Sequence, residues 1–360
     1  MHRAKDIENI YYNIDIVSSK TESTATTADP VASFSETRDV AIIDNASKYK
    51  MAITRFTMNG IKDIPLFIPV IEAGQPNPNK TVYWITIEAY GLTSSQPVIY
   101  KPASASTTLK TGPFTKQSLG EEYYYIHTYQ HMVNLVNDAI VNAVDDLKAQ
   151  DGTAFQNYVA PVVVFNTDTR KFDWYIPTSN ECKLFFNSNM YNLFSNYPHF
   201  YNSNAPHTQV YQIDTTKRPD TITSGQYYIV KQEAPSIGTF WSPVSSIVFT
   251  SSMLPIVAEG VAPPRIFGES NIATPTNSAS NFEPIITDIA LTLDDAYEYK
   301  QFVSYIPTSQ YRYVSLTDNN QALKSINVNV YWKARMTGEL IPLRMSNQSS
   351  ISIKFLFERK

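Results

Sequence analysis

The stretches INVNVYW (residues 326–332) and ISIKFLF (residues 351–357) decide the fold of this chain. In both, apolar side chains stand at every second position, which is the spacing that buries one face of a β-strand. Two such strands are typical of a β-sandwich or a β-barrel, and we expect the second to hold the end of the chain inside a sheet. Polar residues lie between the apolar ones and mark the face that we expect to be wetter: Asn327, Asn329, Ser352 and Lys354.

The same alternation, interrupted by proline- and glycine-containing segments, predicts strands along most of the chain. Residues 162–165 and 171–176 are separated by a short turn and predict a β-hairpin. The intervals between strands are irregular, so we do not expect a solenoid or a propeller. The other predicted strands cover residues 10–16, 50–58, 82–90, 226–232, 244–250, 254–258, 285–293, 299–306 and 311–316.

One segment, residues 129–149, has the periodicity of a helix. Thr128 has the side chain of an N-cap residue, and Gly152 follows the segment as a stop signal. We expect this amphipathic helix to cover a sheet edge or the open end of a sandwich; a partner-binding groove is the less favoured alternative. Its apolar residues recur every three or four positions: Met132, Val136, Ala139, Ile140, Ala143, Val144 and Leu147.

The fold class that these patterns predict is all-β. A chain of 360 residues can form one large β-sandwich with an insertion or two β domains, and we favour a main domain that carries an insertion. Residues 260–280 are rich in proline, glycine, serine and threonine and predict a long loop.

The composition favours a protein that assembles with others. Aromatic residues make up 13% of the chain and charged residues 17%, whereas about a quarter is usual for charged residues. A surface of Tyr, Asn, Ser and Thr in place of Lys and Glu fits a protein covered by neighbouring subunits. The alternative is an extracellular β-protein with a tyrosine-rich surface. The net charge of −4 argues against a strongly basic nucleic-acid binder, so we do not expect nucleic-acid contact.

The cysteine count and the N-terminus bear on the compartment. Cys182 is the only cysteine, which excludes an intrachain disulfide and a cysteine-clustered zinc site. Residues 1–6 (MHRAKD) lack the apolar run of a secretory signal, and no stretch reaches the roughly 18 apolar residues of a membrane span. We therefore expect synthesis inside a cell without a secretory signal, and no membrane span.

The search for catalytic residues predicts no enzyme. His127 and His131 stand four residues apart, but the glutamate of a metalloprotease motif is missing, and His199 and His207 have no identifiable partner. A glycine-rich phosphate loop is missing, and the lone Cys182 is read as a small buried residue. Neighbouring acids point apart on a strand or turn, so the following pairs are read as solvated surface: Glu121-Glu122, Asp145-Asp146 and Asp294-Asp295. We expect no catalytic, cofactor-binding or metal-binding residue.

The two ends of the chain resemble a known family. The opening segments are IYYNIDI (10–16) and YKMAITRF (49–56), and the closing ones are VNVYW (328–332), IPL (341–343) and ISIKFLFERK (351–360). They look like the minor capsid, or penton, proteins of small double-stranded DNA viruses such as virophages and polinton-like viruses. The resemblance implies a jelly roll of two four-stranded sheets, which forms a pentamer at the fivefold vertices of an icosahedral shell.

On that family's fold, residues 1–90 and 281–360 would form the main jelly roll. Residues 91–280 would be a β-rich insertion that contains the helix near 129–149 and the long loop near 260–280. The implied partners are further copies of the chain, as a homopentamer, and other capsid proteins, with no small-molecule substrate or cofactor. The implied location is the virion.

Three alternatives remain open at this point. The helix and aromatic loops in the middle of the chain depart from a minimal jelly roll, so a major capsid protein with two jelly rolls is one alternative. A host-attachment or carbohydrate-binding sandwich is another, with Trp174, Trp241, Tyr227 and Tyr228 stacking on sugar rings. A hydrolase built on a sandwich is the third, but it needs a converging acid pair that the sequence does not name.

Overall fold

The chain divides into two compact units, residues 1–65 with 243–360 and residues 66–242. The computed structural model describes residues 8–18, 31–59, 64, 83–101, 126, 128–179, 181–202, 210–217, 222–236, 241, 243–257, 284–290, 302–307, 310–317, 321–335, 338, 340–345 and 348–360.

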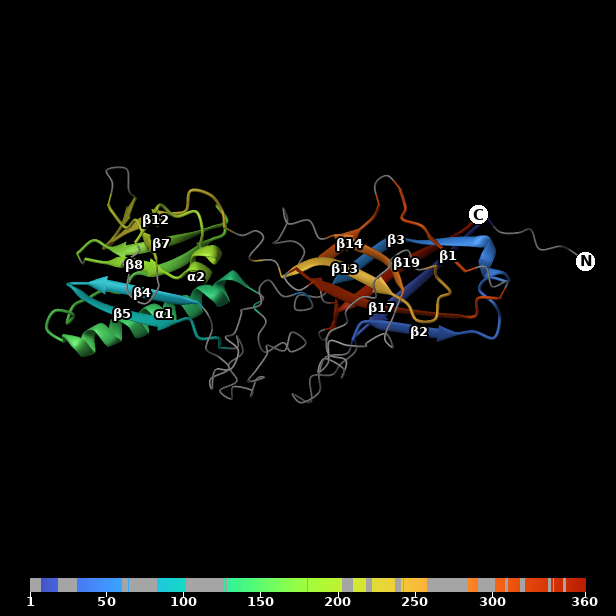
Figure 1. Ribbon diagram of the computed structural model, residues 1–360, viewed down its shortest axis with the longest axis horizontal. Helices are drawn as coiled ribbons and strands as arrows, with labels where there is room; N and C mark the ends of the chain where they lie inside the picture. Colours follow the sequence, from blue (N-terminus) through green and yellow to red (C-terminus); the bar gives the residue numbers. More distant parts are fainter. Residues whose placement is uncertain are drawn as a thin grey trace, which may run out of the picture. The chain divides into compact units, whose positions relative to one another are not determined.

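The first unit is a sandwich of two antiparallel sheets (Figure 1). One, the β1 sheet, has the order β1-β19-β3-β15, and β16 also pairs with β3. The other, the β17 sheet, has the order β14-β13-β17-β18, and β2 also pairs with β17. A short 3₁₀ helix, η1 (Ala46–Lys48), leads into β3. The strands are β1 (Asn9–Val17), β2 (Ser33–Thr37), β3 (Tyr49–Asn59), β13 (Val244–Thr250), β14 (Ile285–Ala290), β15 (Phe302–Tyr305), β16 (Val314–Ser315), β17 (Ser325–Ala334), β18 (Leu340–Pro342) and β19 (Ser350–Arg359).

These pairings are those of a jelly roll. If the strands of at least four residues are numbered in chain order, the β1 sheet reads 1-8-3-6 and the β17 sheet reads 2-7-4-5. The first strand pairs with the last and the second with the seventh, as in a ribbon wrapped into two Greek keys. The predicted all-β jelly-roll fold is confirmed. The second unit lies in the connection between the third and fourth of these strands, β3 and β13.

The two decisive stretches form strands in the interior of the sheets. β19 pairs along its length with β1 on one side and β3 on the other. Its predicted apolar set, Ile351, Ile353, Phe355 and Phe357, is at most 1% exposed. The backbone N–H of Lys360 donates to the Lys48 carbonyl at 2.8 Å. The prediction that these last residues belong to a core sheet is confirmed.

Asn327 differs from the prediction of a wetter face, because it is buried. Its Oδ1 accepts hydrogen bonds from Ser251 Oγ at 2.6 Å and from the Met253 N–H at 2.8 Å, and its Nδ2 donates to Ser252 Oγ at 2.8 Å. The amide therefore fixes the turn that follows β13. The predicted strand 254–258 also differs, since its described part makes one isolated bridge, from Ile256 to Leu316.

The second unit has two antiparallel sheets of its own. One has the order β5-β4-β8-β10-β9, and the other has the order β11-β12-β7-β6. The predicted hairpin is confirmed by the pairing of β6 with β7. The elements are β4 (Trp84–Ala89), β5 (Leu92–Pro97), α1 (Tyr129–Gln150), β6 (Val162–Asn166), β7 (Lys171–Pro177), β8 (Lys183–Phe186), α2 (Ser188–Leu193), β9 (His199–Tyr201), β10 (Tyr211–Ile213), β11 (Thr223–Ser224) and β12 (Tyr227–Lys231).

Helix α1 is the predicted amphipathic helix, and it covers sheet edges. Thr128 is its N-cap, with Oγ1 accepting from the His131 N–H at 3.1 Å. The helix packs on β5 and β6, which are the outer strands of the two sheets (Figure 1). It therefore closes one side of this sandwich, which is the favoured of the two predicted roles, cover for a sheet edge.

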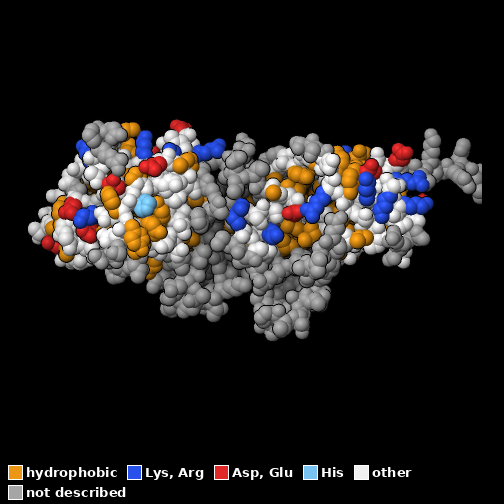
Figure 2. Space-filling model, turned by 45° about the horizontal axis from the view of Figure 1, so that its top comes forward, with side chains coloured by type: hydrophobic (Ala, Val, Ile, Leu, Met, Phe, Trp, Pro, Cys, Tyr) orange, Lys and Arg blue, Asp and Glu red, His pale blue; other side chains and the backbone are white. Residues whose placement is uncertain are grey.

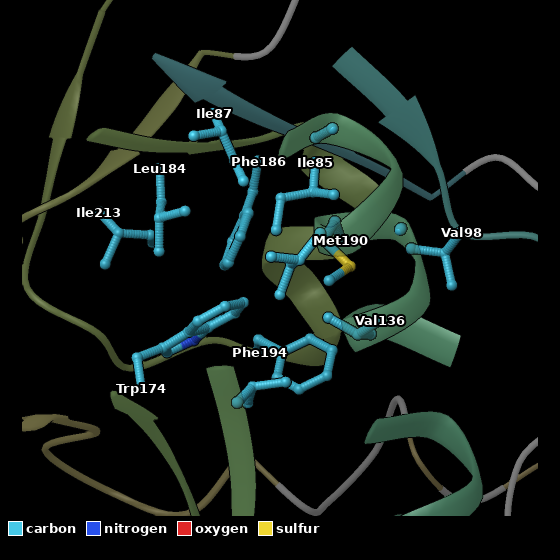
Figure 3. Packing of buried hydrophobic residues seen from close by; sticks show 14 of the residues in the cluster. Ile85, Ile87, Val98, Val136, Trp174, Leu184, Phe186, Met190, Phe194 and Ile213 are labelled. Atoms are coloured by element: carbon cyan, nitrogen blue, oxygen red, sulfur yellow. The ribbon is translucent and has the colours of Figure 1, made fainter. Parts of the chain in front are cut away.

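Large aromatic side chains fill the core between these sheets. Trp174, Phe172 and Phe194 are fully buried, and the rings of Phe172 and Trp241 stack with centroids 5.3 Å apart. Figure 3 shows side chains from β4, β8, β10, α1 and α2 pointing into this core. The unit thus has its own hydrophobic core.

The predicted domain boundaries, after residue 90 and before residue 281, fall inside these units. β4 pairs with β5 and β8 of the second unit, and β13 pairs with β14 and β17 of the jelly roll. Strand patterns do not reveal which sheet a strand joins, and this pairing is what sets the limits of each unit.

Candidate assembly face

The outer face of the β1 sheet carries tyrosine and basic side chains. β1 alternates strictly, burying Tyr12 and Ile14 and turning Tyr11 outward, where it is 56% exposed. On β19 the outward positions include Lys354 and Glu358. We call this surface the tyrosine–lysine face and define it by these residues: Tyr11, Lys50, Arg55, Tyr313, Lys354 and Glu358.

Cations lie against the aromatic rings of this face. Lys354 Nζ is 4.6 Å from the centre of the Tyr11 ring, and Lys50 Nζ is 3.9 Å from that of Tyr313. Lys50 also forms an ion pair with Glu358 at 3.3 Å. Partial burial and the hydrogen bond to Glu358 raise the pKa of Tyr313 to about 12. Accepting that bond lowers the pKa of Glu358, so the carboxylate stays charged.

Two positive charges stand directly opposite each other on this face. Arg55 on β3 pairs in register with Lys354 on β19, next to a bulge in the ladder. Thr54, at the bulge, donates from Oγ1 to the Lys354 carbonyl at 3.2 Å. Like charges in a cross-strand pair destabilise a sheet, and within the described part of the chain neither cation has an acidic partner. The isolated unit therefore has a local excess of positive charge at this pair. Figure 2 shows Lys and Arg side chains gathered at the end of this unit near the C-terminus.

A polar triad closes one side of the jelly roll, where the outer strands β1 and β2 meet. Tyr12 donates a hydrogen bond to Glu36, and Arg38 Nε donates to the same carboxylate at 2.9 Å. The Arg38 guanidinium also lies 5.3 Å from the centre of the Tyr12 ring. Burial, followed by the bond to Glu36, raises the pKa of Tyr12 to about 12. The triad links the two sheets and has the geometry of a structural contact.

The aromatic residues proposed to stack on sugars do not form a surface site. Trp174 is 0% exposed, Trp241 1% and Tyr228 8%, and only Tyr227 is partly exposed. Trp241 Nε1 donates to the Leu193 carbonyl at 2.8 Å, deep in the core of the second unit. That assignment was wrong because large rings are favoured in a core once a second sheet covers them.

The histidines are placed separately. His131 is buried at the start of α1, its Nε2 is 2.7 Å from the Lys101 carbonyl oxygen, and burial lowers its pKa. His199 lies on β9, and His127 and His207 lie outside the described residues. Over the described ranges, no three His, Cys, Asp or Glu side chains come together as a metal site.

The remaining candidates have structural surroundings. Asp146 on α1 accepts a hydrogen bond from Ser94 Oγ at 3.1 Å and another from Gln96, which fastens the helix to β5. Asp145 is 3.7 Å from Lys148. Burial raises the pKa of Cys182 to about 12, so its thiol stays protonated. Two acid pairs lie outside the described residues: Glu121-Glu122 and Asp294-Asp295.

One group of surface residues was missed. His199–Tyr201 forms the edge strand β9, which is not among the predicted strands, and all three of its residues are exposed. Tyr191 and Tyr211 lie beside this strand. The alternation of His199, Phe200 and Tyr201 is too short to be distinguished from a loop.

The strand orders define a jelly-roll protein, the class from which viral shells, lectins and cupins are built. Comparison with known proteins narrows this class. The family model of the Sputnik minor capsid protein V18/19 matches residues 10–359, so the chain belongs to that family. It is a minor capsid protein of the virion, as the resemblance in its terminal segments implied.

Individual relatives agree with this membership. The chain is 29% identical to "Uncharacterized protein V18" of Sputnik virophage over 117 residues, 31% of this chain and 70% of the relative. A chain in the cryo-electron microscopy structure of the Sputnik virophage matches with a TM-score of 0.75 at 21% identity, covering 98% of both chains. The mavirus penton protein matches with a TM-score of 0.63 at 17% identity, covering 98% of this chain and 100% of the penton protein. Among the helices that the structure describes, none is long and apolar enough to cross a membrane.

Proposed function

We propose that this minor capsid protein is a penton subunit, five copies of which form a ring at each fivefold vertex of an icosahedral shell. The observation that carries the proposal is the family match over nearly the whole chain, which includes both sheets of the jelly roll. The fold shared with the mavirus penton protein supports it.

The tyrosine–lysine face supports self-assembly in particular. Contacts in a closed ring are heterologous, so this face would meet a different surface of the next subunit. Tyr11 offers an exposed ring with few rotatable bonds, as is common at interface cores. The opposed charges of Arg55 and Lys354 would be neutralised by an acidic group of the neighbour. The partners that we infer are thus further copies of the chain and other capsid proteins.

A double jelly roll is the less favoured arrangement. The described strands of the second unit follow the orders β5-β4-β8-β10-β9 and β11-β12-β7-β6, with α1 across one side. Neither order pairs a first strand with a last one, as a second jelly roll would. We also infer that the chain builds the shell without catalysing a reaction, because its family is one of structural proteins.

Native mass spectrometry of the purified protein, over a range of protein and salt concentrations, tests the proposal. The proposal predicts a species with the mass of five chains. The amount of this pentamer should fall as the salt concentration rises, because salt screens the charged contacts between subunits. A stable trimer would favour a shell protein with two jelly rolls instead. A monomer at every concentration, with or without purified major capsid protein, would contradict the ring.

A further inference from the structure

Aromatic side chains gather at the free edge of the second unit. Tyr191 lies on α2, His199 and Tyr201 lie on β9, and Tyr211 lies on β10. We call these four residues the edge tyrosine cluster. The jelly-roll assembly described above does not use this cluster.

The cluster continues the inner face of the sheet beyond the core. Ile85, Phe186, Tyr211 and Tyr201 lie opposite one another in turn across β4, β8, β10 and β9. The first two are 0% exposed and belong to the core in Figure 3, whereas Tyr201 is 71% exposed. A row of side chains on the inner face of a sheet is normally covered by another element along its whole length. In this row, the last side chain, Tyr201, is exposed to solvent. Leaving such a ring exposed forgoes the stabilisation that burial of its apolar surface would give, and a ligand that covers the ring can recover it.

The rings form a fixed arrangement. Tyr191 and Tyr211 stack in parallel, with centroids 4.3 Å apart and 5° between their planes. The Tyr201 ring stands at 87° to Tyr211, with centroids 6.1 Å apart. His199 lies 4.6 Å from Tyr191, ring centre to ring centre, and its Nδ1 is 3.0 Å from the Tyr197 carbonyl oxygen. The stacked rings and the contact of the imidazole with the Tyr197 carbonyl preorganise the cluster for ligand binding.

Polar groups border these apolar rings. His199 Nδ1 lies 2.9 Å from the Tyr191 hydroxyl oxygen and 3.0 Å from the Tyr197 carbonyl oxygen. Because a carbonyl oxygen can only accept, we assign the ring proton to Nδ1, and Nε2 is then an acceptor with no partner in the part of the chain that the structure describes. Among the strands that the structure describes, β9 is the outer strand of its sheet. The Asn202 N–H donates to Val210 and the Asp214 N–H to Pro198, so by the alternation of an antiparallel ladder the backbone groups of His199 and Tyr201 point away from β10.

We propose that the edge tyrosine cluster binds a neutral carbohydrate. A pyranose ring has an apolar C–H face and a rim of hydroxyl groups, which match an exposed aromatic ring bordered by an imidazole acceptor and by backbone groups that point away from β10. The Tyr201 ring stacks on the C–H face, and His199 Nε2 accepts a hydrogen bond from a sugar hydroxyl. The site lies on residues other than the tryptophans first expected to contact sugars.

The charge and size of the cluster favour a sugar over other occupants. The cluster contains no Lys, Arg, Asp or Glu, so it lacks the lysine or arginine that would pair with a phosphate or an acidic peptide. A stable protein interface needs about 20 to 30 residues a side, whereas this cluster has the extent of one or two sugar rings.

Saturation-transfer NMR on the full-length protein tests this proposal, with the methyl glycosides of glucose, galactose, mannose and N-acetylglucosamine as probes. We expect transfer to the C–H protons of one ring face for at least one probe. Tyr201→Ala should weaken binding about tenfold or more, and Tyr201→Phe, which keeps the ring, should stay within about threefold. The ring of Tyr201 is exposed, so the variant should fold.

Phe200→Ala is the matched control. Phe200 is 54% exposed on the same strand, but it pairs with Gln212 and so points to the opposite sheet face. It should leave sugar binding unchanged. The proposal is overturned if none of the four probes shows transfer, or if Phe200→Ala and Tyr201→Ala reduce it equally. It is also overturned if Tyr201→Ala breaks up the oligomer, because the cluster would then be a subunit contact.

Discussion

Asn137 on α1 binds both backbone groups of Val163 on β6: its Nδ2 is 3.0 Å from the carbonyl oxygen, and its Oδ1 is 3.0 Å from the backbone nitrogen. β6 is the outer strand of its sheet, and Val163 is fully buried. A buried backbone group without a partner is costly, so this one side chain takes the place of a neighbouring strand. Helix α1 is thereby fixed to the sheet edge that it covers.

Replacing Asn137 with leucine should destabilise the second unit by about 1 to 3 kcal/mol, because the Val163 groups lose their partners. Hydrogen exchange of the Val163 amide should accelerate correspondingly. Asn134→Leu, on the exposed side of the same helix, is the control and should change stability by less than about 0.5 kcal/mol. Equal effects of both substitutions would show that the amide contact is unimportant.

The second unit should lose stability in mild acid because of His131. Burial lowers the pKa of this histidine in the folded state, so below the unfolded pKa of about 6.5 the unfolded chain binds the proton more readily. The stabilisation by neutral His131 is fully present above that pH and is lost as the pH falls toward the folded pKa. Chemical unfolding between pH 5 and 8 measures it, and His131→Gln should flatten the slope. An unchanged slope in the variant would assign the pH dependence to other groups.

Replacing each of the two buried tryptophans of the second unit with phenylalanine should lower its stability by different amounts. Trp241 Nε1 donates to the Leu193 carbonyl, whereas Trp174 Nε1 is buried without a partner among the described residues. Trp241→Phe loses a hydrogen bond, while Trp174→Phe removes an unsatisfied donor, so the second should be less destabilising by about 1 kcal/mol. Thermal unfolding compares the two variants directly, and the reverse order would contradict the assigned contacts.

Arg55→Gln should raise the stability of the isolated subunit and lower the stability of the ring. It removes the like-charge pair with Lys354, which should stabilise the isolated subunit by roughly 0.2 to 1 kcal/mol. It also removes a charge that the neighbouring subunit is proposed to neutralise, so the ring should dissociate at lower salt. Lys333→Gln, an exposed site on β17 in the other sheet, is the control for net charge. A ring as stable as that of the unchanged protein would exclude Arg55 from the interface.

The sequence predicts best where one physical rule decides the outcome. Alternation identifies Ile351 to Phe357 as one buried face, because β19 lies between two strands with a core below it. The burial of Asn327 was not predictable, since its partners follow a strand far away in the chain. The exposure of aromatic rings was not predictable either: Trp174 is covered and Tyr201 is not, and only the pairing of strands into sheets separates them. Short strands such as β9 carry too few residues for a pattern.

As a penton subunit, this minor capsid protein is proposed to close the fivefold vertex of the shell. An icosahedral reconstruction of the assembled virion tests it most directly, by fitting the jelly-roll unit, with its β1 and β17 sheets, into the density at each symmetry axis. We expect five copies around each fivefold axis, with the tyrosine–lysine face at a contact between subunits. Density for the unit in the trimeric capsomers of the shell faces, and other density at the vertices, would contradict it.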